Sequence, residues 1–166
     1  MSNRIYNVVD LFAGCGGLSL GFQNAGFSII AAFDNWDEAI NIYKLNFSHP
    51  IIKRDLNDTS DLSDIENLKP DIIIGGPPCQ DYSSAGHRNE DLGRAQLTIK
   101  FAEIITRIRP SFFLMENVPN IQKSEKLDQV LNMFHESGYG ISKMVIDASR
   151  CGVPQKRRRF IVLGGL

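Results

Sequence analysis

Short apolar runs alternate with amphipathic stretches along this chain, and the alternation predicts strands and helices in turn. Strands are expected at residues 5–12, 28–33, 51–53, 71–75, 111–115, 143–146 and 160–164. Helices are expected at about residues 17–25, 36–46, 60–67, 94–108 and 124–137. This order predicts an α/β fold, with a mostly parallel sheet and helices on both faces. The last two strands are joined by a short segment, which predicts an antiparallel hairpin at one edge of the sheet.

The length of 166 residues is enough for one domain with its own hydrophobic core. The hydrophobic fraction of 43% is ordinary for a soluble protein, and no apolar run approaches the roughly 18 residues that cross a membrane. The N-terminal segment MSNRIYNVVD lacks the charged-then-apolar pattern of a signal peptide. We therefore expect a cytoplasmic protein with no membrane partner.

Net charge and cysteine content limit the kinds of site that the chain is expected to carry. A net charge of -1 does not by itself indicate nucleic-acid binding, although basic residues cluster at 156–159. The three cysteines, Cys15, Cys79 and Cys151, are an odd number at wide spacing, without a CxxC pair. This pattern predicts neither a disulfide framework nor a zinc site, but it allows a reactive thiol.

A glycine-rich segment, Ala13-Gly14-Cys15-Gly16-Gly17, directly follows the first expected strand. Glycines let a backbone turn sharply and approach a ligand at the N-terminus of the next helix. The alternative is a tight turn that binds nothing. The spacing is GxGG rather than GxGxxG, which disfavours a nicotinamide-dependent oxidoreductase.

Acidic residues end the second and third expected strands. Asp34 is placed to accept hydrogen bonds from ribose hydroxyls, and Trp36 can lie against an adenine ring. The alternative makes Asp34 a helix N-cap and Trp36 a packing residue. Asp55 can receive the amino group of adenine, or it can be a solvated turn residue, which is the better interpretation of that residue alone.

The fourth expected strand leads into Gly75-Gly76-Pro77-Pro78-Cys79. Two glycines and two prolines predict a stiff loop with Cys79 at its tip. A cysteine that served only the core would lie within the apolar run rather than beyond it. This position favours Cys79 as a nucleophile.

The remaining candidates are one carboxylate and two guanidinium groups. Glu116 follows four apolar residues, an unfavourable place for a carboxylate without a function, and it can donate a proton to a ring nitrogen; the alternative is a turn cap. Arg157 and Arg159, two apart at the start of the last strand, are expected to point together towards a phosphate or carbonyl, although a solvated turn is the commoner role of such a run. The sites after the first five strands share the carboxyl ends of expected parallel strands, where open α/β sheets build their sites.

The ordered motifs DLFAGCGGLSLGF, FDNWDEA, GGPPCQDYS, MENV and VPQKRRRF resemble the DNA cytosine-C5 methyltransferases of bacterial restriction–modification systems. The resemblance covers nearly the whole chain and implies a Rossmann-like sheet that uses S-adenosylmethionine. It implies Cys79 as the nucleophile, Glu116 at cytosine N3, and Arg157 and Arg159 in the catalytic site. The cofactor-binding residues that it implies are Phe12, Gly14, Gly16, Gly17, Leu18, Asp34, Trp36, Asp55, Leu56, Pro78 and Leu97.

The expected reaction is methyl transfer to carbon 5 of cytosine in double-stranded DNA, through a covalent adduct with Cys79. Members of the family continue into a target-recognition region and a C-terminal segment, and these are not found in residues 1–166. We therefore expect one part of a split or truncated enzyme, with a second chain or the missing region supplying target recognition. The alternatives are an RNA (tRNA) cytosine-C5 methyltransferase and a catalytically silent cofactor-binding subunit.

Overall fold

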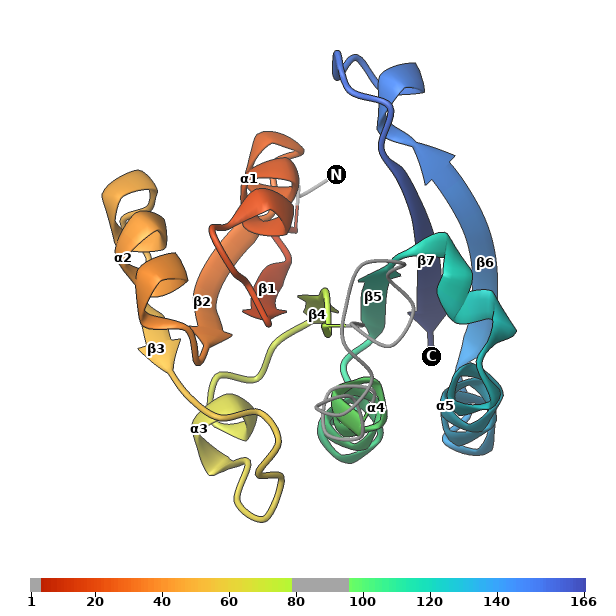
Figure 1. Ribbon diagram of the computed structural model, residues 1–166. Helices are drawn as coiled ribbons and strands as arrows, with labels where there is room; N and C mark the ends of the chain where they lie inside the picture. The colour runs from red at the N-terminus through yellow and green to blue at the C-terminus, as the bar shows by residue number, and fades with distance from the viewer. Residues whose placement is uncertain (1–3, 79–95) are drawn as a thin grey trace.

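The computed structural model describes residues 4–78 and 96–166, which form a seven-stranded sheet with helices on both faces (Figure 1). The strands are β1 (Asn7–Leu11), β2 (Ser28–Asp34), β3 (Ile51–Lys53), β4 (Ile72–Gly75), β5 (Phe112–Asn117), β6 (Gly140–Asp147) and β7 (Arg158–Gly165). The α-helices are α1 (Gly17–Asn24), α2 (Asp37–Asn46), α3 (Ser63–Glu66), α4 (Gln96–Ile108) and α5 (Glu125–Glu136). Two short 3-10 helices are η2 (Pro119–Lys123) and η3 (Ala148–Arg150).

The strand order is β3-β2-β1-β4-β5-β7-β6, which confirms the expected α/β fold. The first five strands are parallel, and β7 is inserted antiparallel between β5 and β6. The predicted edge hairpin is therefore confirmed. Because β7 runs antiparallel, its first residues lie at the edge where the parallel strands end.

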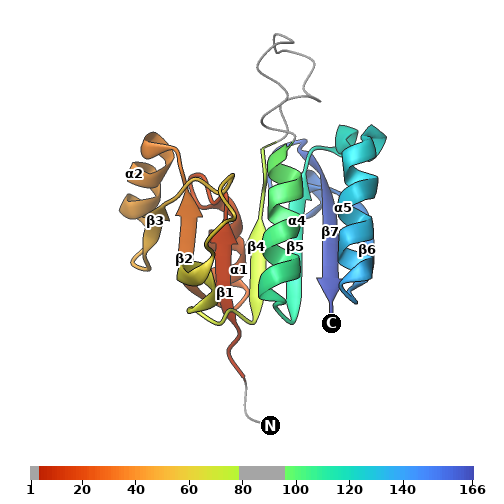
Figure 2. The ribbon, with the colours of Figure 1, turned by 90° about the horizontal axis from the view of Figure 1, so that it is seen from below.

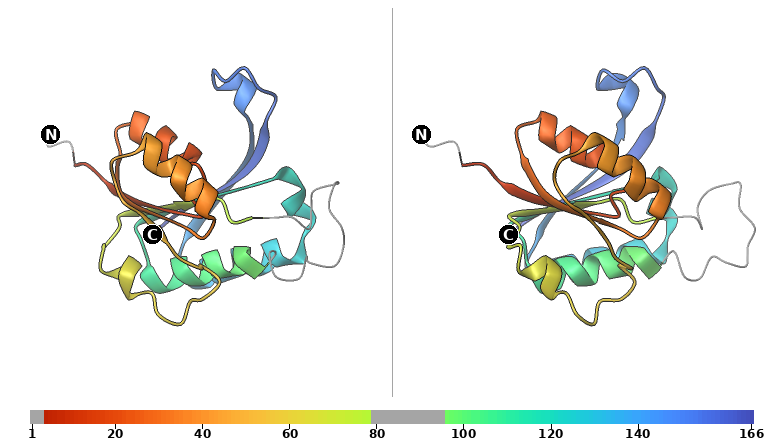
Figure 3. Two further views of the ribbon diagram at one scale, coloured as in Figure 1. Left: turned by 60° about the vertical axis from the view of Figure 1, so that its left-hand side comes forward. Right: turned by 90° about the vertical axis from the view of Figure 1, so that its left-hand side faces the viewer.

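The helices form two layers around the sheet. Figure 3 shows α1 and α2 on one face and α3, α4 and α5 on the other. Figure 2, seen from the side of α4 and α5, shows these two helices running side by side along the strands. Their buried side chains pack on alternate residues of β1, β2, β4 and β5, and the cluster includes Leu11, Phe33, Ile73, Phe101, Phe113 and Phe134. Burial of each such side chain stabilises the fold by about 1.5–3 kcal/mol.

The other face of the sheet is covered by α1 and α2 only over its first strands. Over β5, β7 and β6 this face carries no helix from residues 4–78 or 96–166 (Figure 1). A groove of about 810 Å³ lies there, lined mainly by apolar side chains that include Phe22, Phe27, Phe112, Leu114 and Leu163. Phe112 keeps 46% and Leu163 keeps 39% of its surface exposed. We call this feature the apolar groove.

Three expectations about element bounds are corrected. The strand expected at 111–115 continues to Asn117, because Glu116 pairs with Ile161 and Asn117 with Phe160 in β7. The strand expected at 143–146 spans residues 140–147, and its mostly exposed side chains gave no alternating pattern to reveal the extra length. The helix expected at 60–67 has four residues, within a segment of turns. None of the described helices has the length and hydropathy needed to cross a membrane.

Candidate active site

The turn that leaves β1 is strained and tightly packed. Phe12, Gly14 and Gly16 all have positive φ, at 56°, 55° and 92°. For a non-glycine residue such as Phe12 this conformation costs about 1–2 kcal/mol. A Cβ atom added to Gly16 would lie 2.2 Å from Cε2 of Phe47, so glycine is required there for space as well as for φ. Strain of this kind, kept in a turn just before a helix N-terminus, is typical of turns that approach a ligand.

Asp34 connects the end of β2 to this turn. Its Oδ2 accepts a hydrogen bond from the backbone N–H of Gly14 at 2.7 Å, and its Oδ1 accepts one from the N–H of Trp36 at 2.9 Å. The N-cap of α2 is Trp36, so the alternative that made Asp34 the helix cap is wrong. Trp36 is 62% exposed, so it is not a packing residue either. Both side chains are therefore placed beside the turn, with the indole open to solvent.

Asp55 and Leu56 follow β3 and differ in their surroundings. The exposed Asp55 accepts a hydrogen bond from the N–H of Asn57 at 2.9 Å, as a turn residue does. Leu56 is 2% exposed and packs into the core. Asp55 is thus a turn residue that also faces the cavity described below.

Arg54 fixes the shape of the segment after β3. Its Nη1 pairs with Oδ2 of Asp64 at 2.5 Å, and its Nη2 donates to the carbonyl oxygens of Asp58 and Asp61. Hydrogen bonds from the Ser60 hydroxyl and N–H hold the pKa of Asp58 below its usual value. The loop after β3 is therefore held by the arginine around which it folds.

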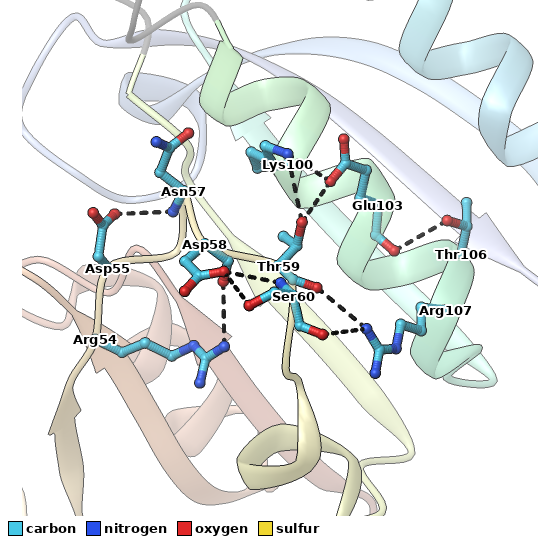
Figure 4. Close-up of polar contacts among 10 residues, drawn as sticks. All are labelled: Arg54, Asp55, Asn57, Asp58, Thr59, Ser60, Lys100, Glu103, Thr106 and Arg107. Carbon is cyan, nitrogen blue, oxygen red and sulfur yellow. Dashed lines mark hydrogen bonds and ion pairs between the residues drawn. The ribbon is translucent and has the colours of Figure 1, made fainter.

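The same segment is tied to α4 (Figure 4). Thr59 Oγ1 donates to Glu103 Oε2 at 2.7 Å, and Lys100 Nζ pairs with the same oxygen at 2.9 Å. Arg107 Nη1 donates to the carbonyl oxygens of Thr59 and Ser60 at 3.2 and 3.3 Å. Since α4 also carries Leu97, two walls of the neighbouring cavity are fixed to each other.

These segments enclose a cavity of about 700 Å³ at the carboxyl ends of the strands. Seven of the eleven residues expected to bind the cofactor line it, namely Phe12, Asp34, Trp36, Asp55, Leu56, Pro78 and Leu97. Sequence reasoning missed three lining residues, Asn35, Arg54 and Gly76. Asn35 and Arg54 are sequence neighbours of residues that were named, and Gly76 belongs to the segment that leads to Cys79. Carboxylates beside an exposed indole and apolar walls suit a ligand that has hydroxyl groups and a flat ring.

The other four expected residues do not line the cavity. Gly14, Gly16 and Gly17 form the turn beside it, where they present main-chain groups. Leu18 is partly buried and packs against the apolar cluster of Val8, Ile29, Ile72 and Ile74 on the α1 face of the sheet. Its side chain therefore serves packing rather than this cavity.

Glu116 and the two arginines lie together at the same edge of the sheet. Nε of Arg159 is 2.6 Å from Oε1 of Glu116, and Nη2 of Arg157 is 3.9 Å from the same oxygen. The prediction that the two guanidinium groups point to one place is confirmed. The side chains of Glu116 and Arg159 are 22% and 25% exposed, so this ion pair is partly shielded from water.

Cys79 lies outside the described residues, but the segment before it is well defined. The side-chain amide of Asn117, which is 3% exposed, donates to the carbonyl oxygen of Pro77 at 3.2 Å. A Cβ atom added to Gly76 would lie 3.3 Å from Oε2 of Glu116. Sequence reasoning gave Asn117 no role, because neither its burial nor its distant partner is visible in the local sequence.

Comparisons with known proteins agree with this geometry. The sequence profile described as C-5 cytosine-specific DNA methylase matches residues 6–166. The Type II methyltransferase M.HindV of Haemophilus influenzae is 57% identical over 159 residues, which cover 95% of this chain and 52% of that protein. M.HgiDI of Herpetosiphon aurantiacus is 53% identical over 157 residues, which cover 94% of this chain and 51% of that protein. The chain thus spans about half the length of these curated relatives.

Solved structures show the same fold. An E. coli prophage protein described as a DNA modification methyltransferase superposes with a TM-score of 0.84 at 34% identity, over 96% of this chain and 46% of that one. The Dnmt2 methyltransferase of S. pombe superposes with a TM-score of 0.83 at 21% identity, over 98% of this chain and 50% of that one. At that identity the second likeness concerns the fold alone.

Proposed function

The chain belongs to the C-5 cytosine-specific DNA methylase family, and we propose that it transfers a methyl group from S-adenosylmethionine to carbon 5 of cytosine in DNA. The observation that carries the proposal is that one residue, Gly76, borders two sites. Gly76 lines the cavity, and it also lies against Glu116 of the arginine-paired cluster. A cavity for a methyl donor and a polar site for a base therefore adjoin one another, three residues before Cys79 in the chain.

The cavity suits S-adenosylmethionine by its set of side chains. Each oxygen of Asp34 already accepts one N–H, and a carboxylate oxygen can accept a further hydrogen bond, here from a ribose hydroxyl. Trp36 offers an exposed aromatic face to adenine, and Asp55 offers an acceptor for its amino group. Bound there, the cofactor supplies an electrophilic methyl group on a sulfonium.

The protein's part of the reaction is to make carbon 5 of cytosine nucleophilic. We assign Cys79 as the thiolate that adds to carbon 6, while Glu116 gives a proton to N3. The ring loses its aromaticity and electron density moves to carbon 5, which takes the methyl group. Loss of the carbon-5 proton to water then breaks the bond between carbon 6 and sulfur, and N3 returns its proton to Glu116, so that the ring, the acid and the thiolate are all restored. The target base is stacked in a duplex, so it must be flipped out before this attack.

We assign the two arginines to orienting Glu116 and the cytosine ring. In the structure Arg159 holds the carboxylate of Glu116, with Arg157 at the outer side of the pair. With cytosine bound, we assign Arg159 to the base carbonyl, which a guanidinium can reach without giving up its neighbour because it has several donors.

Target recognition is assigned to the rest of the methyltransferase, because the chain spans about half the length of its relatives. We propose that a C-terminal segment of the complete protein, in the same chain or in a second one, covers the apolar groove. The groove is lined mainly by apolar residues, and exposed apolar patches of this kind mark surfaces that bind other protein.

Mechanism-based trapping tests the proposal. The chain, alone and with its remaining half, is mixed with S-adenosylmethionine and DNA that contains 5-fluorocytosine. The fluorine on carbon 5 cannot leave as a proton does, so a working enzyme stays bound to the DNA through its cysteine. We expect a covalent adduct by mass spectrometry that Cys79→Ala abolishes.

Cys151→Ala is the matched control, because Cys151 is an exposed thiol outside the glycine turn and outside the cavity. It should leave the adduct intact. An adduct with RNA but not with DNA would assign the activity to RNA, and the lack of any adduct with the complete protein would leave a cofactor-binding subunit.

A further inference from the structure

A chain of hydrogen bonds runs from the centre of the sheet to the surface beneath the glycine turn. Ser19 Oγ donates to Oδ2 of Asp10 at 2.6 Å and lies 2.7 Å from the Tyr43 hydroxyl, which lies 2.6 Å from Nε2 of His49. The four residues come from β1, α1, α2 and the segment before β3. Asp10, Ser19 and Tyr43 are fully buried, whereas His49 is partly exposed. These hydrogen bonds therefore connect solvent with the carboxyl group of Asp10 in the core.

Asp10 is an unfavourable residue for this place in the fold. Its Oδ1 is buried and has no hydrogen-bond partner among the residues that the structure describes. Burial raises the pKa of Asp10 to about 7, against the hydrogen bonds from the hydroxyl and N–H of Ser19 and with the help of the Asp34 charge. An apolar side chain would fill the same position at lower cost, so packing alone does not account for Asp10.

The chain of hydrogen bonds bears directly on the glycine turn. Gly16 is the N-cap of α1 and has no side chain to cap it, and Asp10 supplies the missing acceptor to Ser19, the third residue of the helix. A Cβ atom added to Gly16 would also lie 3.0 Å from Cδ2 of Tyr43. A shift of Ser19 or Tyr43 would therefore displace the backbone of the glycine turn.

We propose that Asp10, Ser19, Tyr43 and His49 position the glycine turn for the cofactor, and that His49 is the end through which this buried chain exchanges protons with solvent. The inference rests on the proposed function, since it assigns S-adenosylmethionine to the cavity beside the turn. Asp10 and Ser19 are positioning residues that act through the turn.

The direction of the donors follows from the charge of Asp10. When Asp10 is ionised, His49 donates to Tyr43, Tyr43 to Ser19, and Ser19 to the carboxylate. When Asp10 is protonated, the donors can run the other way, from Asp10 to Nε2 of His49. The ionised form holds the N-terminus of α1 more strongly, because a negative charge is favourable there.

Few of the groups that surround Asp10 are charged or titratable. The neighbours of Asp10 in the sheet are Ala32 and Ile74, α1 and α2 present Ser19 and Tyr43, and Asp34 is the carboxylate whose charge acts on Asp10. Burial lowers the pKa of His49 below its usual value. The response near neutral pH is therefore assigned to Asp10.

Two opposite trends with pH follow. The pKa of Asp10 is higher in the folded chain than its ordinary 3.8, so the folded state binds more protons between about pH 4 and 7. The contribution of Asp10 to the free energy of unfolding then falls as pH rises through this range and levels off above pH 7. Affinity for the cofactor rises over pH 6–8, because the ionised form holds the turn. A purely structural Asp10 would give the first trend without the second.

The test compares two buried tyrosines by calorimetric titration of S-adenosylmethionine into the full chain. Tyr43→Phe removes only the hydroxyl in the middle of the hydrogen-bonded chain, and we expect affinity at pH 8 to fall about tenfold. Tyr139→Phe is the matched control, because Tyr139 is 2% exposed and its hydroxyl donates to the Pro110 carbonyl at 2.7 Å within the cluster on the other face of the sheet. It should leave the affinity within about twofold. Ser19→Thr, which keeps a hydroxyl, should bind more tightly than Ser19→Ala.

Asp10→Asn should abolish both trends with pH. Equal affinities of Tyr43→Phe and Tyr139→Phe would reduce the hydrogen-bonded chain to a structural role and overturn the proposal. If the unaltered chain binds no S-adenosylmethionine even with its remaining half, the proposed function fails instead. Nitrogen NMR of His49 then tests the connection itself: its ring signals should move in Asp10→Asn, and unchanged signals would refute the proton path.

Discussion

Two hollows of similar size, about 700 and 810 Å³, lie on this domain, and they are built in opposite ways. The cavity at the strand ends has walls made of turns, which are held by hydrogen bonds such as those from Gly14 and Trp36 to Asp34. The apolar groove lies on the flat of the sheet, where strand side chains such as Phe112, Leu114 and Leu163 line it together with Phe22 and Phe27. One is fixed by directional polar contacts and the other by the two-residue repeat of a strand.

The difference indicates what each hollow can recognise. Directional contacts hold individual atoms in place, as a small polar ligand requires. An apolar strand face offers no directional contacts, only a complementary shape and a hydrophobic surface, and such a face suits another protein segment. The predictions below separate the two by changing one hollow at a time.

The largest effect is expected at Gly16. Gly16→Ala adds a positive-φ cost of about 1–2 kcal/mol and an overpacking cost of about 1–3 kcal/mol against Phe47. Gly26→Ala is the control, because Gly26 has a similar φ of 89° but open space around its Cβ position. In urea unfolding Gly16→Ala should lose clearly more stability than Gly26→Ala, and it should also weaken cofactor binding. Equal losses would mean that Phe47 yields without cost.

An intermediate effect is expected at Asp34. Asp34→Asn removes the charge that accepts from two backbone N–H groups, worth about 1.5–3 kcal/mol, or roughly 10–150-fold in the cofactor dissociation constant. Asp37→Asn is the same change in an exposed ion pair with Lys53, and it should leave binding unaltered. Calorimetric titration of S-adenosylmethionine into both variants decides whether Asp34 contributes to cofactor binding.

The smallest effect on the domain itself is expected in the apolar groove. Leu163→Lys should change the stability of the isolated chain by less than about 1 kcal/mol and should not alter cofactor binding. It should nevertheless weaken association with the rest of the methyltransferase by about tenfold or more, because a charge would have to be buried. Leu45→Lys, at an 85% exposed leucine of α2, is the control in a pull-down titration. Equal association of the two variants would show that the groove is not the docking surface.

Most of the architecture could be predicted from the sequence, because strand and helix periods differ and glycine follows the strands. The pairing of Arg157 and Arg159 was also predictable, since residues two apart share a face of a strand. The length of β6 was not, because its side chains are mostly exposed and its bounds depend on pairing with β7. The hydrogen bond from Asn117 to Pro77 joins residues 40 apart in sequence, and the hydrogen bonds beneath Gly16 join residues of different strands, helices and loops, so no local pattern could reveal them. The side chain of Leu18 shows the converse, since a glycine-rich motif does not tell which of its members face the ligand.

The antiparallel insertion of β7 also sets the order in which the molecule can be completed during synthesis. The turn, the loop after β3 and α4 all precede Glu116 in the chain, whereas Arg159 follows it by 43 residues. At the usual rate of 5–20 residues per second, a ribosome adds Arg159 roughly 2–9 s after Glu116. During that interval Glu116 has been made without its arginines, while the segments that form the cavity have all been made. The charged pair is therefore the last part of the site that synthesis can complete.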